Sequence, residues 1–491
     1  MDHDTSAISA HPWRLLIGGD LVPAARGGRY TTHDPSTERP LAHVPDGDAE
    51  DVDRAYRAAA AAAPGWRATA PRARARTVRE LARVLRANAE ELARLDVHDL
   101  GSPYPMMLLD VERAADSLDL FADWALQLTG EVIPASAEHL HYTLREPYGV
   151  VARILPFNHP VMFAAGKIAA PLMAGNTVLV KPAHQTPLSA LRTGELFADV
   201  LPPGVLNVVS GAGPATGAAI SAHPGIRRIA FIGSESVGRA IQADAARAAV
   251  KHVTMELGGK NAMVVFPDAD LEAAADGAVR GMNFTASTGQ SCGSTSRLLV
   301  HRDIAADLTD RLRARMTALR VGHPLDPDTD VGPLVSADQY RKVLDHLDRA
   351  RRDGATTLCG GTRPPGLDAG HFIAPTLLTG VRPDMDAANQ EIFGPVLSVL
   401  PFGTEDEAIR LANSVDYGLT ASVWTNDLTC AHRLAVALEA GFVWVNGASQ
   451  HFPGVPYGGV KASGLGREES LDELLGFTQT KAVTVFNAAP C

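Results

Sequence analysis

The 491-residue chain carries a net charge of −11, and 46% of its residues are hydrophobic while 21% are charged. At roughly 150 residues per domain, this length predicts about three domains or lobes, with a core large enough to need no disulfide or metal for stability. The acidic balance excludes a dedicated nucleic-acid binder, because such a protein needs a basic surface to displace counterions. We therefore expect no nucleic-acid partner.

The cysteines also argue for an ordinary globular protein. Cys292, Cys359, Cys430 and Cys491 lie far apart with no CxxC pair, which predicts neither a metal site nor a disulfide framework. A reducing compartment fits this pattern, so we expect the cytoplasm. Residues 2–4 form an acidic start without a basic region, which argues against a signal peptide. No uninterrupted apolar stretch approaches the ~18 residues that would predict a membrane span.

The first third of the chain mixes short strands with helices. Residues 1–45 predict strands and turns, Asp48 is expected to cap a helix running to Ala63, and apolar residues at helical spacing predict a second helix over residues 72–95. Residues 126–148 read as hairpin-like strands, and TKAVTVF near the chain end reads as another. These strands fit a contact between subunits by sheet extension, although a covered edge within one monomer would explain them equally well.

From Gly149 the pattern becomes a regular alternation of strands and helices. The segments GVVARILPF, TVLVKP, VLNVVSG, RIAFIGS and HVTMELGG read as strands, with helices predicted between them at residues 160–173 and 187–200. Apolar strands separated by helices of this length indicate a parallel sheet covered on both faces. The right-handed crossover rule then predicts a doubly wound, Rossmann-like α/β domain.

The alternation starts again after Lys260 and predicts a second α/β domain. NAMVVF and SRLLVH read as strands, and helices are expected over residues 269–284 and 304–319.

Three short segments contain residues suited to catalysis. Cys292, in GQSC, has small neighbours that leave room for a substrate, but a free thiol needs help to ionise at neutral pH. Glu256, in ELGGK, follows a strand end, where doubly wound domains place residues that face ligands. Asn158, in PFNHP, offers an amide donor to an oxyanion. Taken singly, each has a simpler explanation as a buried thiol, a surface carboxylate or a turn residue.

Two further segments could bind a nucleotide. FIGSESVG follows a strand and opens a helix, so Ser234 and the adjacent glycines could hold a phosphate at a helix N-terminus. VKPAHQTP places Lys181 and His184 beyond another strand end. No GxGxxG motif follows a strand, and a helix cap would also explain Ser234.

In combination, the motifs PFN, KPA, FIGS, ELGGK, GQxC, EIFGP and GGVKASGLGRE, in this order, resemble the aldehyde dehydrogenase superfamily over nearly the whole chain. The resemblance implies NAD(P)-dependent oxidation of a small-molecule aldehyde to a carboxylic acid through a thioester, by a homodimer or homotetramer. It also implies an NAD(P)-binding domain at residues 1–125 and 147–257, a catalytic domain at 258–448, oligomerisation strands at 126–146 and 470–491, and a return segment at 449–469.

The resemblance implies a role for each matching residue. Cys292 matches the nucleophile, Glu256 the general base, Asn158 the side-chain half of the oxyanion hole, and Lys167 a lysine sometimes assigned to proton relay. The residues expected to contact the cofactor are Lys181, His184, Gly233, Ser234, Val237, Leu257, Glu391, Phe393 and Pro156. The residues expected in the substrate pocket are Phe157, His159, Met162, Phe163, Ser291, Gly293, Gln450, His451 and Tyr457.

This chain departs from the common family pattern at three places. Phe157 and His159 flank Asn158 where many members have Trp and an aromatic residue, and the loop before Cys292 is longer. Many members that prefer NAD have Glu at the position of His184, and a histidine removes the repulsion of a 2′-phosphate. We therefore expect NAD or NADP, with a lean toward NAD because no further Arg or Lys adjoins. The aromatic residues and histidines of the pocket favour an aromatic or polar aldehyde.

Three alternative functions remain open from the sequence. A CoA-acylating semialdehyde dehydrogenase would release the thioester to CoA, and the presence of Glu256 argues against it. A cofactor-free thiol esterase could use the same Cys292 and Glu256. A silent binding protein on this scaffold would be expected to lack one of the three catalytic residues.

Overall fold

The computed structural model describes residues 5–134 and 136–486. The acidic start at residues 2–4, Cys491 and the last part of the predicted oligomerisation segment, residues 487–491, lie outside the described residues.

The first lobe is built on an eight-stranded sheet of order β2-β1-β9-β8-β7-β10-β11-β21. Strands β9, β8, β7, β10 and β11 run parallel. Every residue of β7, β8 and β10 is buried, as expected for strands covered on both faces. The doubly wound α/β prediction is confirmed. The strand bounds are β1 Leu15–Ile17, β2 Asp20–Val22, β7 Val150–Ile154, β8 Thr177–Lys181, β9 Leu206–Val208, β10 Arg228–Ile232, β11 His252–Glu256 and β21 Gly464–Leu465.

The helices of this lobe differ from the predicted ones in several places. Their bounds are α1 Ser6–Ala10, α2 Ala49–Ala68, α3 Pro71–Ala87, α4 Ala89–Leu100, α5 Tyr104–Asp123, the π-helix η1 Met162–Gly166, α6 Ala169–Met173, α7 Leu188–Ala198, α8 Pro214–Ala222, α9 Glu235–Ala248 and α17 Leu471–Gly476. Asp48 caps α2 as predicted, but the helix continues beyond Ala63 and past Pro64. Its last turn is anchored because the buried Trp66 indole donates to the Leu172 carbonyl at 3.0 Å.

Two other helix predictions were wrong. The single helix over residues 72–95 is two helices, which meet at Asn88, whose side-chain amide donates to the Val84 carbonyl at 2.8 Å. The helix over residues 160–173 is divided into η1 and α6 by a turn at Lys167. The long helix α5 was not predicted at all.

The second lobe contains a seven-stranded sheet of order β14-β15-β16-β13-β12-β18-β19, parallel except for β14. The predicted helix over 269–284 ends early, because Asn283 adopts a left-handed conformation with φ of 54°. The bounds are β12 Ala262–Val265, β13 Arg297–His301, β14 Thr356–Cys359, β15 Thr376–Thr379, β16 Val396–Phe402, β18 Thr420–Trp424, β19 Phe442–Val445, α10 Leu271–Gly281, α11 Phe284–Ser287, α12 Ala305–Ala318, α13 Ala337–Arg352, α14 Asp386–Asn389, α15 Glu405–Asn413 and α16 Leu428–Ala437.

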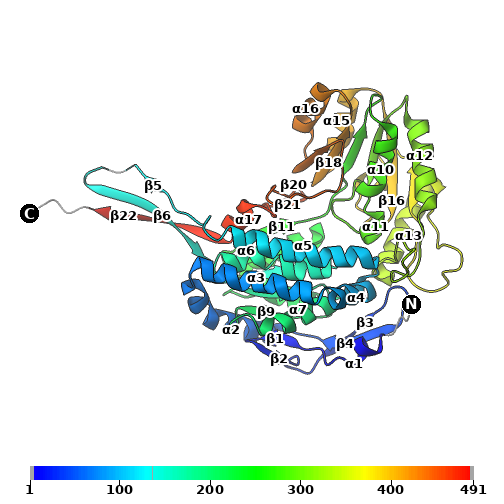
Figure 1. Ribbon diagram of the computed structural model, residues 1–491. Helices are drawn as coiled ribbons and strands as arrows, with labels where there is room; N and C mark the ends of the chain where they lie inside the picture. Colours follow the sequence, from blue (N-terminus) through cyan, green and yellow to red (C-terminus); the bar gives the residue numbers. More distant parts are fainter. Residues whose placement is uncertain (1–4, 135, 487–491) are drawn as a thin grey trace, which may run out of the picture.

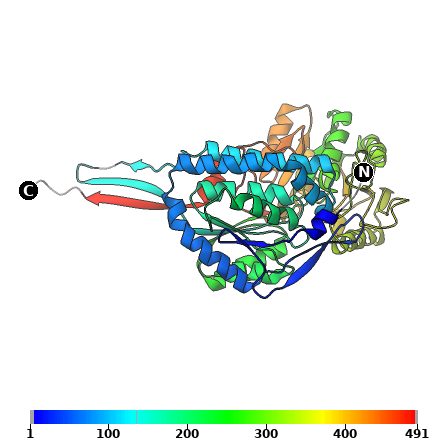
Figure 2. The same cartoon turned by 60° about the horizontal axis from the view of Figure 1, so that its bottom comes forward.

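A three-stranded antiparallel sheet extends from the body as an arm, in both views (Figures 1 and 2). It consists of β5 Val132–Ile133, β6 His139–Pro147 and β22 Thr478–Phe486. Two small sheets pair β3 Arg29–His33 with β4 Pro40–Pro45, and β17 Tyr417–Gly418 with β20 Val460–Lys461. Over the described ranges, no helix combines the length and apolar character needed to cross a membrane.

The parallel strands of the first lobe bring their carboxyl ends to one edge. Ile154 of β7 pairs with Lys181 of β8, and Ile232 of β10 pairs with Glu256 of β11. In an open α/β sheet, ligands bind outside the carboxyl ends of the strands. The chain leaves this edge through residues 257–261 and enters the second sheet at β12, so the edge lies at the junction of the two lobes.

Candidate active site

Cys292 lies in the loop that precedes β13, and the side chain of Asn261 is hydrogen-bonded to this loop. The Asn261 amide nitrogen donates to the carbonyl oxygens of Cys292 at 2.7 Å and Ser294 at 2.9 Å, while its oxygen accepts from the Thr420 amide at 3.1 Å. A Cβ atom at Gly259 would lie 2.8 Å from the Cys292 carbonyl oxygen. Only glycine therefore lets the segment after β11 pass this close to the loop.

Asn158 contacts the same loop from the first lobe. Its side-chain amide donates to the Gln290 carbonyl at 2.9 Å, and the Gln290 side chain is itself fixed by bonds with Val335 and Ser287. An amide NH₂ carries two donors, so this bond orients Asn158 and leaves a second N–H. Asn158 thus contacts the loop that carries Cys292.

The Cys292 side chain is partly accessible, with Ser291 and Gly293 beside it. Burial, together with the nearby carboxyls of Glu391 and Glu256, raises the pKa of its thiol to about 12 against the lowering effect of the Gly293 amide. The Gly293 N–H also donates to the Ser291 hydroxyl at 3.3 Å. The thiol is therefore neutral at pH 7 unless other groups stabilise the thiolate.

Glu256, at the end of β11, is a buried carboxyl, and neither of its oxygens has a hydrogen-bond partner among the described residues. Burial raises its pKa well above the ordinary value, and the charge of Glu468 raises it further against the opposing effect of Lys167 and Arg467. A Cβ atom at Gly458 would lie 2.7 Å from its Oε1. An unpaired buried carboxyl is costly, and such groups cluster at functional sites.

Lys167 lies beside Glu256 but is part of a buried ion-pair network. Its ammonium lies 2.7 Å from Glu468, which Arg153 also contacts at 2.6 Å. Arg153 pairs with Glu473 as well. Against the effect of burial, Lys167 and Arg153 hold the pKa of Glu468 at about 2, and this pairing raises the pKa of Lys167.

The predicted pocket residues divide into two groups. On the first lobe, the His159 Nδ1 is hydrogen-bonded to the Asp110 carboxylate at 2.6 Å, and the His159 ring packs on Phe163. The Phe157 ring meets the Phe393 ring edge-on, with 5.6 Å between ring centroids. Met162 is half-buried beside them.

On the return segment, His451 pairs with Glu469 at 2.9 Å and its ring lies 4.3 Å from that of Tyr457. Gln450, also expected in the pocket, accepts a hydrogen bond on its carbonyl from the Trp444 indole at 2.8 Å.

The residues expected to hold the adenosine half of a cofactor lie along the strand ends. The buried Lys181 ammonium donates to the carbonyl of its neighbour Pro182 at 3.0 Å, and burial lowers its pKa to about 8. His184 lies in the next turn, and burial, followed by Lys181, lowers its pKa.

The expected pyrophosphate side follows β10. Ser234 occupies the position just before α9 and is exposed, as is Val237, while the Gly233 amide donates to the Glu256 carbonyl at 3.0 Å. Leu257 is buried and its amide donates to Ser463 at 2.9 Å. Pro156 is half-buried after β7.

Glu391 and Phe393 reach out of the second lobe to its neighbours. The Glu391 carboxylate accepts from the Gly259 amide at 2.9 Å, and a Cβ atom at Gly258 would lie 2.2 Å from its Oε2. Phe393 adopts a φ of 57°, and the Gln339 side chain donates to its carbonyl at 2.6 Å. Glu391 therefore contacts the segment that adjoins the Cys292 loop, and the Phe393 ring meets Phe157 of the first lobe.

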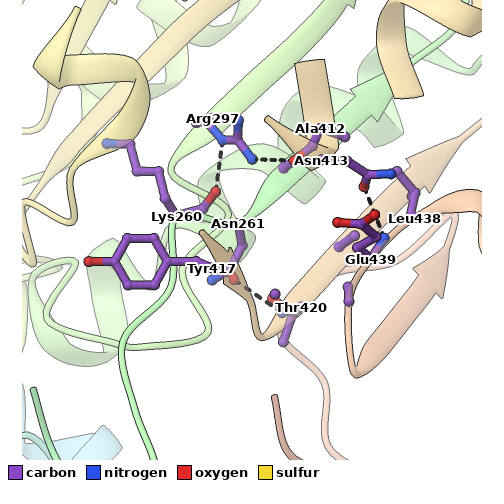
Figure 3. A pocket seen from close by; sticks show the side chains of 13 residues that line it. Lys260, Asn261, Arg297, Ala412, Asn413, Tyr417, Thr420, Leu438 and Glu439 are labelled. Atoms are coloured by element: carbon purple, nitrogen blue, oxygen red, sulfur yellow. Dashed lines mark hydrogen bonds between the residues drawn. The ribbon is translucent and has the colours of Figure 1, made fainter. Parts of the chain in front are cut away.

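A small pocket is lined by Lys260, Asn261, Arg297 and Glu439, among other residues. Figure 3 shows Arg297 donating to the Lys260 carbonyl, with the Lys260 side chain extending away from Glu439. The Lys260 ammonium is buried without a hydrogen-bond partner, and burial lowers its pKa to about 7. None of the predicted catalytic residues lines this pocket.

Sequence reasoning missed several residues of the site. Asn261 directly follows the ELGGK motif, Glu468 ends the GGVKASGLGRE motif, and Asp110 lies on the unpredicted helix α5. The first two could have been found from their place in a recognised motif. No cluster of metal-ligating side chains occurs in the described part of the chain.

Comparison with known proteins finds similar sequences and similar structures over nearly the whole chain. The model of the aldehyde dehydrogenase family matches residues 22–483. The chain is 43% identical to aldehyde dehydrogenase tropH of Talaromyces stipitatus over 480 residues, which is 96% of this chain and 93% of that protein. An aldehyde dehydrogenase of Bacillus cereus, solved with NAD⁺, superposes with a TM-score of 0.95 at 38% identity and covers 99% of both chains. Betaine aldehyde dehydrogenase of Staphylococcus aureus, also solved with NAD⁺, gives a TM-score of 0.96 at 33% identity, with 99% of this chain and 97% of that one covered.

Proposed function

The chain belongs to the aldehyde dehydrogenase family and oxidises aldehydes with NAD or NADP, and from this premise we propose that Cys292 is its nucleophile and Glu256 its general base. The observation that carries the proposal is the buried Glu256 carboxyl, which lacks a partner and acts electrostatically on Cys292. A carboxyl kept poor in hydrogen bonds and raised in pKa is suited to accept a proton from water.

The first half of the reaction forms a covalent bond at Cys292. Its thiolate adds to the aldehyde carbon, and the carbonyl oxygen becomes an oxyanion. The second N–H of Asn158 and the backbone N–H of Cys292 are the proposed donors to this oxyanion. A donor of this kind typically contributes about 10²–10³ in rate, and the bond from Asn158 to Gln290 fixes its orientation beforehand.

The residues at these strand ends fit a nicotinamide dinucleotide. Lys181 presents a buried ammonium with one neighbouring carbonyl as its partner, Ser234 stands at the start of α9, where a helix N-terminus favours phosphate, and Glu391 offers a carboxylate fixed by Gly259. These residues would hold the cofactor, which when bound would supply the hydride acceptor. Loss of the hydride from the adduct carbon would leave a thioester on Cys292.

The second half of the reaction is hydrolysis of this thioester. Glu256 draws a proton from water, the hydroxide equivalent attacks the acyl carbon, and the thiolate leaves with release of the carboxylic acid. Neutral Glu256 cannot do this, so its raised pKa makes the step depend on pH. Lys167, paired with Glu468, lowers the pKa of Glu256 and so favours its ionised form.

The pocket favours a neutral aromatic or polar aldehyde over a long alkyl chain. The aromatic rings of Phe157, Phe393 and Tyr457 supply flat apolar surface, whereas His159 and His451 place imidazoles beside it. The ring nitrogen Nδ1 of each histidine is engaged by a carboxylate, so each retains Nε2 for a substrate hydroxyl. For the cofactor we favour NAD, because the charged groups that act on His184 among the described residues are Lys181 and the carboxylate of Asp338, which would oppose a 2′-phosphate.

The arm supports assembly into a dimer or tetramer. Its strands carry exposed apolar side chains, among them Val132, Leu140, Leu144 and Val485, and an exposed edge strand is suited to pair with another subunit. Light scattering at low micromolar concentration tests this, with a monomer as the contrary result. We further propose the cytoplasmic location that the sequence led us to expect.

A panel of aldehydes with NAD and NADP tests the proposed roles. The parent enzyme should reduce the cofactor, Cys292→Ala should lose this activity by at least about 10³-fold, and cofactor binding should persist in the variant. Aldehyde oxidation that survives removal of the thiol would contradict the proposal.

A further inference from the structure

Tyr457 is held rigidly between the return segment and the second lobe. Its backbone N–H donates to the Glu468 carbonyl at 3.0 Å and its carbonyl accepts from the Glu468 amide at 2.7 Å. Its ring lies between His451, at 4.3 Å, and Phe442, at 5.7 Å between ring centroids. The residue is 6% exposed, so its hydroxyl occupies a fixed position.

That hydroxyl lies beside the residue that follows the nucleophile. The Tyr457 Oη is 3.2 Å from the point where a Cβ atom at Gly293 would stand, and Cys292 is among the groups that raise the pKa of Tyr457. The Gly293 amide also stabilises the ionised form of the thiol. The Tyr457 hydroxyl and the Gly293 amide are therefore placed as two donors near the Cys292 thiol.

A thiol in this environment needs such donors. Burial and the carboxyls of Glu391 and Glu256 all disfavour a negative charge on Cys292, and no cationic side chain is bonded to its sulfur in the described structure. A phenol next to the thiol is a neutral donor that adds no repulsion. Its own ionisation is opposed, because burial, Cys292 and Glu256 raise the pKa of Tyr457 well above the ordinary value. The phenol thus keeps its proton available.

We propose that the Tyr457 hydroxyl donates a hydrogen bond to the Cys292 sulfur and so positions the thiolate for attack on the aldehyde. The inference rests on the proposed role of Cys292 as nucleophile. Tyr457 is a positioning residue, since it acts through the sulfur, and its packing on His451 links the shape of the substrate pocket to the state of the thiol.

The test is the pH dependence of Cys292 alkylation by iodoacetamide in the enzyme without cofactor. The thiolate displaces iodide and forms a sulfur–carbon bond, so the rate reports the thiolate directly. In Tyr457→Phe the midpoint of the profile should rise by about one pH unit, because hydrogen bonds to charged groups are among the stronger ones. Below both midpoints the fraction of thiolate falls about tenfold, but the less acidic thiolate is a better nucleophile by about threefold. The labelling rate should therefore fall by only about threefold.

Matched variants separate this role from a structural one. Tyr104→Phe removes a hydroxyl at the start of α5 and should leave the profile unchanged, and Tyr457→Phe should keep the parent melting temperature because the ring remains. Cys292→Ala should show no labelling by mass spectrometry at this position. If Cys292→Ala still oxidised aldehydes, the proposed function would fail. If Cys292→Ala lost aldehyde oxidation but Tyr457→Phe gave the parent pH profile, the proposed function would stand and this inference would be overturned.

Discussion

The side-chain amide of Asn261 donates a hydrogen bond of 2.7 Å to the carbonyl oxygen of Cys292. Asn261 directly precedes β12 of the second lobe, whereas Asn158, which bonds the Gln290 carbonyl of the same loop, follows β7 of the first. The nucleophile loop is therefore held by two amides, one from each lobe. Its geometry depends on the two lobes keeping their relative positions.

Replacing Asn261 with Ala should weaken the site and the fold together. The change removes the donors to Cys292 and Ser294 and the acceptor of the Thr420 amide, and unmet buried groups cost about 1–3 kcal/mol each. We expect a loss of at least about 2 kcal/mol in the free energy of unfolding, measured with urea, and a fall in kcat. Asn426→Ala, at an exposed site, serves as the control. Parent stability in Asn261→Ala would show that the clamp has no energetic role.

Replacing Glu256 with Gln should separate the two halves of the reaction. The amide keeps the shape of the side chain but cannot accept a proton, so thioester hydrolysis should slow by about 10²–10⁴. In rapid-mixing experiments the variant should still reduce one equivalent of cofactor per Cys292 in a fast burst. A loss of the burst would instead place Glu256 in the first half. The variant should be at least as stable as the parent, because a buried carboxyl without partners is removed.

The sequence predicts the fold well where its signals are local and periodic. The apolar runs of β7, β8 and β10 identify a covered parallel sheet, and the structure confirms them. The helix errors arise where tertiary contacts overrule local signals. Pro64 suggests an end to α2, but the buried Trp66 bonds Leu172 and retains another turn, and Asn88 interrupts a pattern that apolar spacing alone continues.

The site is predictable only as far as its motifs reach. Cys292, Glu256 and Asn158 lie in recognisable segments, so their meeting could be expected. The pairing of Lys167 with Glu468 and of His159 with Asp110 joins residues far apart in sequence, and no spacing rule connects them. The lack of hydrogen-bond partners for Glu256 among the described residues likewise depends on tertiary packing around the carboxyl, which no local sequence pattern predicts.

Replacing Glu468 with Gln should shift the pH dependence of hydrolysis downward. The charge of Glu468 raises the pKa of Glu256. The ion pair between Glu468 and Lys167 also reduces the effect of the Lys167 charge on Glu256. Removing that charge therefore lowers the pKa of Glu256, so the rise of the thioester hydrolysis rate with pH should begin at lower pH. Single-turnover measurements across the pH range check this, and an upward shift would contradict it.

The same variant should lose stability in a pH-dependent manner. The pKa of Glu468 lies at about 2 in the folded protein, below its ordinary value of 4.5, so the carboxylate stabilises the fold above 4.5 and this contribution is lost as pH falls toward 2. Breaking a buried pair costs roughly 3–5 kcal/mol. The deficit of Glu468→Gln in urea unfolding should thus be largest at neutral pH and shrink in acid. A constant deficit would exclude this linkage.

Replacing His184 with Glu should restrict the cofactor to NAD. Burial and Lys181 lower the pKa of His184, so the imidazole is neutral at pH 7 and neither repels nor attracts a 2′-phosphate. A carboxylate there would repel that phosphate and could accept a hydrogen bond from a ribose hydroxyl. We expect kcat/KM with NADP to fall at least about tenfold, equivalent to about 1.4 kcal/mol, while kcat/KM with NAD is kept or improved. His184→Gln, which adds no charge, is the matched control and should retain the parent ratio. If both variants changed the ratio equally, charge at this position would not be the determinant, and cofactor choice would have to arise elsewhere along the strand ends.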